Sequence, residues 1–379
     1  MTERQQLSPR SVQSVLITGY YGFGNFGDEV ALDILIQSCV QNGLRVSVLC
    51  KDSQQIRERH SESDVALISK AALRTRFRAV RTTDFVILGP GGLLKRTPVG
   101  GTSSILAVAL VDILFCIALG RRFSLHSVGA GDLSLADRAA LRLALPYADS
   151  ITVRDTRSHR ALFSAGVSDV SLVDDSIHEH LSLSPSQTAR KDLPSNIKAE
   201  SIAVAPSASD RGAIKDRHSY LTQLYSAIKR TAGTHTKLFG VVSQSGDLAD
   251  ISLLRDLEEM GVEFEKIVDL SEHSLSEALA QMKHIDACVT SRFHVGVIFD
   301  YLKKPVVRIG SDPKLSDAPN SPEKTANGRE VLFEALSTTG VVPKPRPGFL
   351  VVAALATFVH RARVAFNRAS WVISGKFDQ

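Results

Sequence analysis

Short apolar runs alternate with helical patterns along the first half of the chain. Helical patterns at 30–41, 103–120 and 135–145 separate runs that predict strands. Those runs lie at residues 14–20, 44–50, 84–90, 122–131, 150–155 and 170–175. Apolar strands separated by helices are typical of a parallel sheet that is covered on both faces.

The same alternation returns after a polar, proline-containing stretch at 183–199, which we interpret as an interdomain linker. Strands are predicted at 201–207, 237–243, 265–270, 286–291 and 305–310, with helices between them. The pattern therefore predicts an α/β protein with two Rossmann-like domains, 1–182 and 200–340, facing each other across a cleft. Ligands of such sheets bind beyond the carboxyl ends of the strands.

The apolar run at 103–120 is at the lower length limit for a membrane span, and it contains Asp112. A helix buried against a sheet is the better interpretation. The N-terminal residues MTERQQLSPRSVQ are polar and show no secretory signal.

The four cysteines are scattered in apolar stretches, and no two of them form a CxxC pair. We expect Cys39, Cys50, Cys116 and Cys288 to be free, buried thiols of a reducing compartment, and the protein to be cytoplasmic.

Hydrophobic residues make up 44% of the chain and charged residues 22%, which is ordinary for a globular protein with full cores. The net charge of +5 is a mild excess that fits an anionic substrate or a membrane surface. Zinc-finger spacing and RNP-like aromatic runs are missing from the sequence, so a nucleic-acid partner is not expected.

Three stretches at predicted strand ends carry candidate chemistry. The first is GYYGFGNFGDEV (19–30), where glycines let the backbone approach a ligand and a helix starting near Asp28 offers free N–H groups. Its aromatic rings suit stacking on a sugar, whereas a structural turn is the plain alternative. The second strand lacks a terminal acidic residue, so a dinucleotide site is unsupported.

The second stretch is the glycine loop GPGGLLKRT (89–97), which also follows a strand. The third places Arg292 and His294 where a strand gives way to a helix. A phosphate or carboxylate there would meet helix N–H groups and a guanidinium fork. His294 would exchange a proton near neutral pH, although a lone histidine is more often structural.

These stretches, together with ITVRDTRSHRALFSAGV (151–167) and SLVDD (171–175), resemble the polysaccharide pyruvyl transferase family. The resemblance is ordered and spans about residues 14–315. Phe293 stands where the family usually has Leu, and GPGG replaces the usual GGG. Neither change removes a reacting group. Family members have two Rossmann-like domains in a GT-B-type arrangement, in agreement with the pattern.

The resemblance implies an enzyme that transfers the pyruvyl group of phosphoenolpyruvate to a sugar of a cell-surface polysaccharide or its precursor. The product is a ketal and phosphate is released, with no further cofactor. Adjacent carboxylates such as Asp174 and Asp175 point to opposite faces of a strand, so no metal site is expected.

On this interpretation the C-terminal domain binds phosphoenolpyruvate, which needs several donors and positive charge. Arg292 is the first choice for an anionic group, with Arg211 or Arg217 as a second clamp. His294 is the candidate acid or base, and it also supports the departing phosphate.

The N-terminal domain would then hold the saccharide acceptor, which is lipid-linked or free. Asp28 is the candidate base for an acceptor hydroxyl, and capping its helix is the competing role. The acceptor-side residues of this interpretation are Tyr21, Gly22, Phe23, Asn25, Asp28, Gly91 and Gly92.

Two other functions remain open because a fold does not fix a function. A nucleotide-sugar glycosyltransferase of GT-B type would release a nucleotide, and a non-catalytic sugar-phosphate-binding protein would release nothing.

The tail at 341–379 has a different composition. From Gly348 to Gly375 it contains no Asp or Glu, and four basic side chains are interleaved with apolar ones. This pattern predicts a basic amphipathic helix, either in contact with the inner face of the membrane or packed back onto a domain.

We predict weak, salt-sensitive binding to anionic vesicles, lost on truncation after Pro347. Each basic side chain near an anionic surface is attracted by about 1 kcal/mol, and apolar burial adds to that. Sedimentation with anionic vesicles at low and high salt measures the binding. If the full-length chain fails to bind at low salt and truncation lowers the melting temperature, the tail is a structural strap instead.

Overall fold

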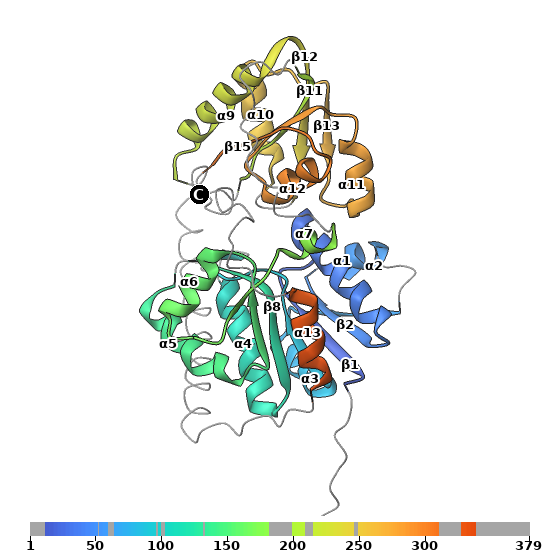
Figure 1. Cartoon of the computed structure of the whole chain (residues 1–379), viewed down its shortest axis with the longest axis vertical. Coiled ribbons are helices and arrows are strands. Elements are labelled where there is room, and N and C mark those ends of the chain that lie inside the picture. Colours follow the sequence, from blue (N-terminus) through green and yellow to red (C-terminus); the bar gives the residue numbers. More distant parts are fainter. Residues whose placement is uncertain are drawn as a thin grey trace, which may run out of the picture.

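The computed structural model describes residues 12–51, 53–59, 64–95, 98–99, 103–131, 133–181, 199–208, 215–245, 249–310 and 327–338. It shows two domains, each built on a parallel sheet with helices against it (Figure 1). The predicted α/β class with two Rossmann-like domains is confirmed. The tail at 341–379 and nearly all of the linker lie outside the described residues.

The N-terminal sheet has the order β10-β9-β8-β4-β1-β2-β3, and β5 pairs with β8 beside this path. All of these strand pairs are parallel. The strands are β1 (Ser14–Thr18), β2 (Arg45–Cys50), β3 (Val65–Ser69), β4 (Phe85–Leu88), β5 (Gly91–Leu94), β8 (Arg122–Ala130), β9 (Ser150–Val153) and β10 (Ser171–Leu172). A separate antiparallel pair joins β6 (Pro98–Val99) and β7 (Ser103–Ser104).

Helices follow most of these strands. They are α1 (Phe26–Gln41), α2 (Ser53–Arg59), α3 (Leu73–Thr82), α4 (Ile105–Leu119), α5 (Leu135–Ala144), the 3-10 turn η1 (Leu145–Tyr147), α6 (Thr156–Ser164) and α7 (Ser176–His180). The apolar run at 103–120 forms α4 and packs in the core, as predicted, with Ile113 and Cys116 fully buried. Within the described residues, every helix is too short or too polar to cross a membrane.

The C-terminal sheet has five parallel strands in the order β13-β12-β11-β14-β15. They are β11 (Ala199–Ala205), β12 (Ala232–Val242), β13 (Lys266–Asp269), β14 (Ala287–Thr290) and β15 (Val306–Arg308). The helices of this domain are α9 (Arg217–Thr231), α10 (Ile251–Glu259), α11 (Leu275–Met282) and α12 (Phe293–Tyr301).

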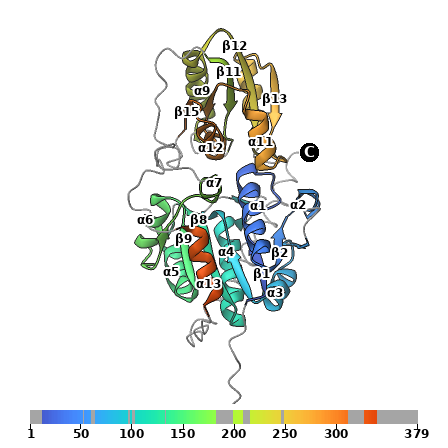
Figure 2. The same cartoon turned by 45° about the vertical axis from the view of Figure 1, so that its right-hand side comes forward.

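One helix returns from the end of the C-terminal domain to the N-terminal one. α13 (Gly328–Ser337) lies against β8 and β9, on the lower domain of Figures 1 and 2. Its Leu332 and Leu336 belong to the same core as Val15 of β1. The predicted boundary at 340 therefore assigned this helix to the wrong domain, because an amphipathic pattern does not say which sheet the helix will cover.

Helix α1 is shared between the two domains. Phe26, Val30 and Ile34 pack in a cluster with residues of the C-terminal sheet, whereas Leu35 and Cys39 pack in the N-terminal core. A helix that is apolar on all sides is a buried helix. The sequence of α1 thus suits a position between two sheets.

Candidate active site at the domain junction

The two glycine loops follow the two central strands of the N-terminal sheet. β1 and β4 are neighbours, with Thr18 beside Leu88 at their carboxyl ends. The strand order reverses there, since β2 and β3 lie on one side and β8 to β10 on the other. This is the topological switch point at which open α/β sheets bind ligands. The placement agrees with the expectation from the sequence.

Hydrogen bonds from α1 hold the first glycine loop in place. Asn25 caps the helix, its side chain accepting from the Asp28 N–H at 3.4 Å. Oε1 of Glu29 accepts from the Gly22 N–H at 2.8 Å, so a buried carboxyl folds the loop back onto the helix. Gly22 and Gly24 have φ of 77° and 64°, which favour glycine.

The aromatic rings of this loop are not open platforms for a sugar. Tyr21 is fully buried and its hydroxyl donates to the Pro90 carbonyl at 3.0 Å, which ties the two glycine loops together. Phe23 stacks on Tyr20 with ring centroids 4.1 Å apart. The Lys70 ammonium lies 4.3 Å from the Phe23 centroid. Tyr21 therefore has no exposed surface for the expected contact with a sugar. One face of the Phe23 ring is covered by Tyr20.

Asp28 lies where the two glycine loops meet. A Cβ added at Gly91 would lie 3.0 Å from its Oδ1, so only glycine lets the carboxylate sit this close to β5. A Cβ added at the next residue, Gly92, would lie 3.2 Å from Nζ of Lys95. The predicted acceptor-side residues Asp28, Gly91 and Gly92 are thus brought together.

His294 reaches this position from the other domain. It lies in the first turn of α12, and its Nε2 is 3.5 Å from Oδ2 of Asp175, the N-cap residue of α7. A Cβ added at Gly27 would lie 1.7 Å from its Nδ1, so the imidazole packs on the first turn of α1. The side chain keeps 14% of its surface exposed, and its Nε2 atom is buried.

Arg154 completes the cluster. Its Nη1 donates to Oδ2 of Asp175 at 3.0 Å, and both side chains are buried. Burial alone would raise the pKa of Asp175, but the His294 and Arg154 charges hold it well below its usual range. Asp175 is therefore an anion that orients His294.

Sequence reasoning did not assign roles to Arg154 or Asp175. The available signal was their place just beyond β9 and β10, within the two segments of the family resemblance. Only the sheet order shows that these ends lie at the same edge as β1 and β4.

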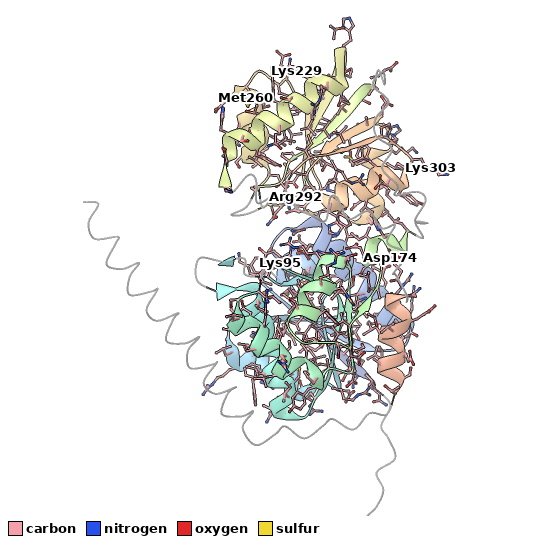
Figure 3. The ribbon with its side chains drawn as sticks, turned by 60° about the vertical axis from the view of Figure 1, so that its left-hand side comes forward. Lys95, Asp174, Lys229, Met260, Arg292 and Lys303 are labelled. Carbon is pink, nitrogen blue, oxygen red and sulfur yellow. The ribbon has the colours of Figure 1, made fainter. Side chains whose placement is uncertain are left out.

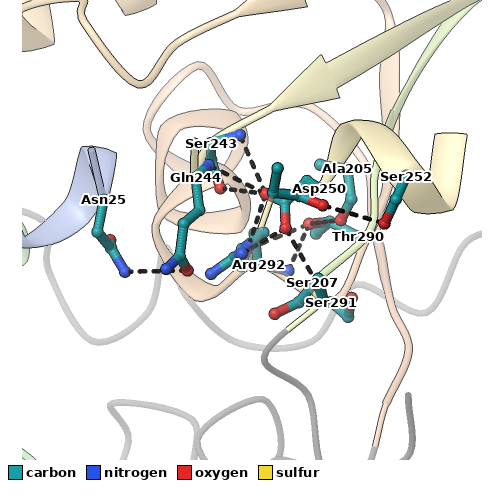
Figure 4. A network of polar contacts seen from close by, with 12 residues as sticks. Asn25, Ala205, Ser207, Ser243, Gln244, Asp250, Ser252, Thr290, Ser291 and Arg292 are labelled. Atoms are coloured by element: carbon teal, nitrogen blue, oxygen red, sulfur yellow. Dashed lines mark hydrogen bonds and ion pairs between the residues drawn. The ribbon is translucent and has the colours of Figure 1, made fainter. Parts of the chain in front are cut away.

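Arg292 is engaged within its own domain. Its Nε donates to Oδ2 of Asp250 at 2.9 Å and its Nη2 to Oδ1 (Figure 4). Asp250 is fully buried. The guanidinium fork assigned to an anionic ligand is therefore occupied by an internal carboxylate.

The Arg292–Asp250 pair holds the segment after β12. Asp250 Oδ2 accepts from the backbone N–H groups of Ser243 and Gln244, both at 3.1 Å. That segment pairs with the first glycine loop: the Phe26 N–H donates to Ser243 O at 2.9 Å, and the Ser245 N–H to Gly24 O at 3.0 Å. Arg292 therefore acts on the first glycine loop through the backbone of its own domain.

Of the two candidates for a second clamp, the structure describes Arg217 alone, and Arg217 does not join the cluster. Arg211 lies outside the described residues. Arg217 starts α9, where its Nε pairs with Asp256 of α10 at 2.6 Å and almost half of the side chain is exposed. The described residues contain no group of three or more His, Cys, Asp or Glu side chains suited to a metal ion.

Comparison with known proteins agrees with this architecture. The model of the polysaccharide pyruvyl transferase family matches residues 25–313. No curated protein matches the chain in sequence. Alr3699/HepE of Anabaena, solved with UDP and glucose, is 14% identical over 96% of this chain and 99% of its own, with a TM-score of 0.53. A glycosyltransferase of Rickettsia africae is 11% identical over 94% of both chains, with a TM-score of 0.50. These two likenesses concern the fold alone.

The buried carboxyl of Glu29 should make the free energy of unfolding depend on pH. Burial raises its pKa from 4.5 to about 7. Between these pH values the unfolded chain loses the proton while the folded protein keeps it, so stability falls as pH rises from about 4.5 to about 7. Over that range the loss is about 3 kcal/mol.

Glu29→Gln keeps the acceptor for Gly22 and has no proton to lose, so its stability lacks this fall. Urea unfolding of both proteins between pH 4.5 and 8 measures the difference, with the exposed Glu334→Gln as the matched control. Parallel pH profiles of wild type and Glu29→Gln would contradict the assignment.

Proposed function

Since the chain belongs to the polysaccharide pyruvyl transferase family, we propose that it transfers the pyruvyl group of phosphoenolpyruvate to two hydroxyls of a sugar, releasing phosphate. One observation carries the proposal. His294 of one domain meets Asp175 and the first turn of α1 of the other, at the switch point of the N-terminal sheet.

The start of α12 supports binding of the anionic donor. Among the described residues no side chain caps this helix, because Arg292 stands at the N-cap and has no acceptor to offer. Its first N–H groups and the positive end of its dipole suit a phosphate or carboxylate. Lys95, at the end of β5, lies on the side of the N-terminal domain that faces Arg292 (Figure 3). The Lys95 ammonium would add its charge to the positive end of the α12 dipole.

The reaction needs one proton delivered and others removed. A sugar hydroxyl attacks C2 of phosphoenolpyruvate, C3 takes up a proton to become a methyl group, and the C2–O bond to phosphate breaks. A second hydroxyl then attacks C2 and closes the ketal. In this proposal His294, held by Asp175, delivers the proton and supports the leaving phosphate. Asp28 accepts the proton of the attacking hydroxyl, and the departing phosphate accepts the proton of the second hydroxyl.

Replacement of His294 tests the proposal. His294→Ala should lower phosphate release from phosphoenolpyruvate by about 10²- to 10⁴-fold, the usual effect of losing an acid-base group. The exposed His235 of β12 gives the control His235→Ala, which should retain activity. Phosphate release is followed with phosphoenolpyruvate and a panel of free and lipid-linked sugars.

A His294→Ala protein that is folded and retains more than one tenth of the wild-type rate would sink the catalytic assignment. Release of a nucleotide from a nucleotide sugar, with no phosphate from phosphoenolpyruvate, would replace the proposed reaction by glycosyl transfer.

Arg292→Lys should lose activity together with thermal stability, because a lysine cannot make the bidentate contact with Asp250.

A further inference from the structure

A pocket lies beside the first glycine loop, on the side of α4. Its cavity volume is about 40 Å³, which is room for a few heavy atoms, so it suits one small substituent rather than a sugar ring. Its walls are mostly apolar, formed by Leu88, Leu93, Ile105, Val108 and Ala109. None of these side chains has a role in the chemistry described above.

The polar side chains that line the pocket carry little net charge together. Asp112 is paired with the buried Arg76 and accepts from the Thr18 hydroxyl at 2.7 Å. Lys70 donates to the Gly19 carbonyl at 3.0 Å, and burial lowers its pKa to about 7. A neutral ligand group with an apolar end and one hydrogen-bonding oxygen matches these walls.

The pocket is close to the candidate base. A Cβ added at Gly91 would lie 3.0 Å from Oδ1 of Asp28, and Leu93, two residues further along β5, lines the pocket. Gly19 and Phe23, which line the pocket, belong to the same stretch (19–30) as Asp28. Tyr20 and Phe23, stacked on each other, form the wall on the loop side.

We infer that this pocket receives an acyl substituent of the acceptor sugar, an acetamido or O-acetyl group. The methyl group packs against Ile105, Val108 and Leu93, and the carbonyl oxygen accepts a hydrogen bond from Lys70. The inference rests on the proposed function, because it assumes that a sugar hydroxyl lies at Asp28.

Matched acceptors test the assignment. A hexose, its 2-acetamido analogue and its O-acetyl ester are compared by kcat/KM for phosphate release from phosphoenolpyruvate. The preferred acetylated acceptor should exceed the parent by about 10- to 100-fold, the usual worth of a small group in an apolar pocket. Comparison of the amide with the ester shows which acyl group fits.

Two variants change the pocket and one serves as control. Val108→Phe fills the space and should bring the ratio of acetylated to parent kcat/KM close to one. Ile105→Ala widens it and should shift preference toward a larger acyl group such as propionyl. Ala118→Phe, exposed on the same helix, should leave the ratio unchanged. An equal rate with all acceptors, or a ratio unaffected by Val108→Phe, would overturn the inference.

A readout without turnover separates the two proposals. Saturation-transfer NMR on the acetamido sugar should show its methyl signal with wild type and lose it with Val108→Phe. If the methyl signal appears but no acceptor releases phosphate, the proposed reaction fails and the pocket stands. If phosphate is released and the methyl signal is missing, the pocket assignment fails alone.

Discussion

The structure depends on the burial of α1 between two hydrophobic cores. Of its sixteen residues, twelve are buried. Its start packs with the C-terminal sheet and its second half with the N-terminal sheet. Apolar burial is the dominant favourable contribution to folding, and a helix buried on all sides fixes what lies against it. The two domains therefore meet in a set geometry, and the first turn of α1, with Asp28, lies at the junction.

The polar contacts at the junction follow from this packing. Once α1 is in place, the glycine loop before it pairs with the segment after β12, and the Gly27 backbone receives the His294 ring. The buried Arg292–Asp250 pair holds that segment in place from within the C-terminal domain (Figure 4). Removing one partner of such a pair leaves an uncompensated buried charge, which is strongly destabilising. A change at Arg292 is thus expected to act on the first glycine loop at a distance.

Much of the fold was visible in the sequence, because strand and helix patterns are local. The runs at 14–20 and 84–90 became neighbouring central strands, and the glycines after them were recognised as one ligand-binding edge. The pairing of Arg292 with Asp250 was not predictable, since 42 residues separate them and an aspartate before α10 looks like a helix cap. Asp175 was set aside as half of an adjacent carboxylate pair. Its contact with His294 depends on how two domains meet, which no local pattern encodes.

We propose that the junction forms a ketal from phosphoenolpyruvate. The most direct test of this proposal follows phosphoenolpyruvate labelled with ¹³C at C2 by NMR, in the presence of protein and a sugar acceptor. We expect the vinyl carbon signal to be replaced by a ketal carbon coupled to the sugar, with one phosphate released per ketal. Labelled phosphoenolpyruvate that stays intact with every free and lipid-linked acceptor, or that yields only pyruvate, would contradict it.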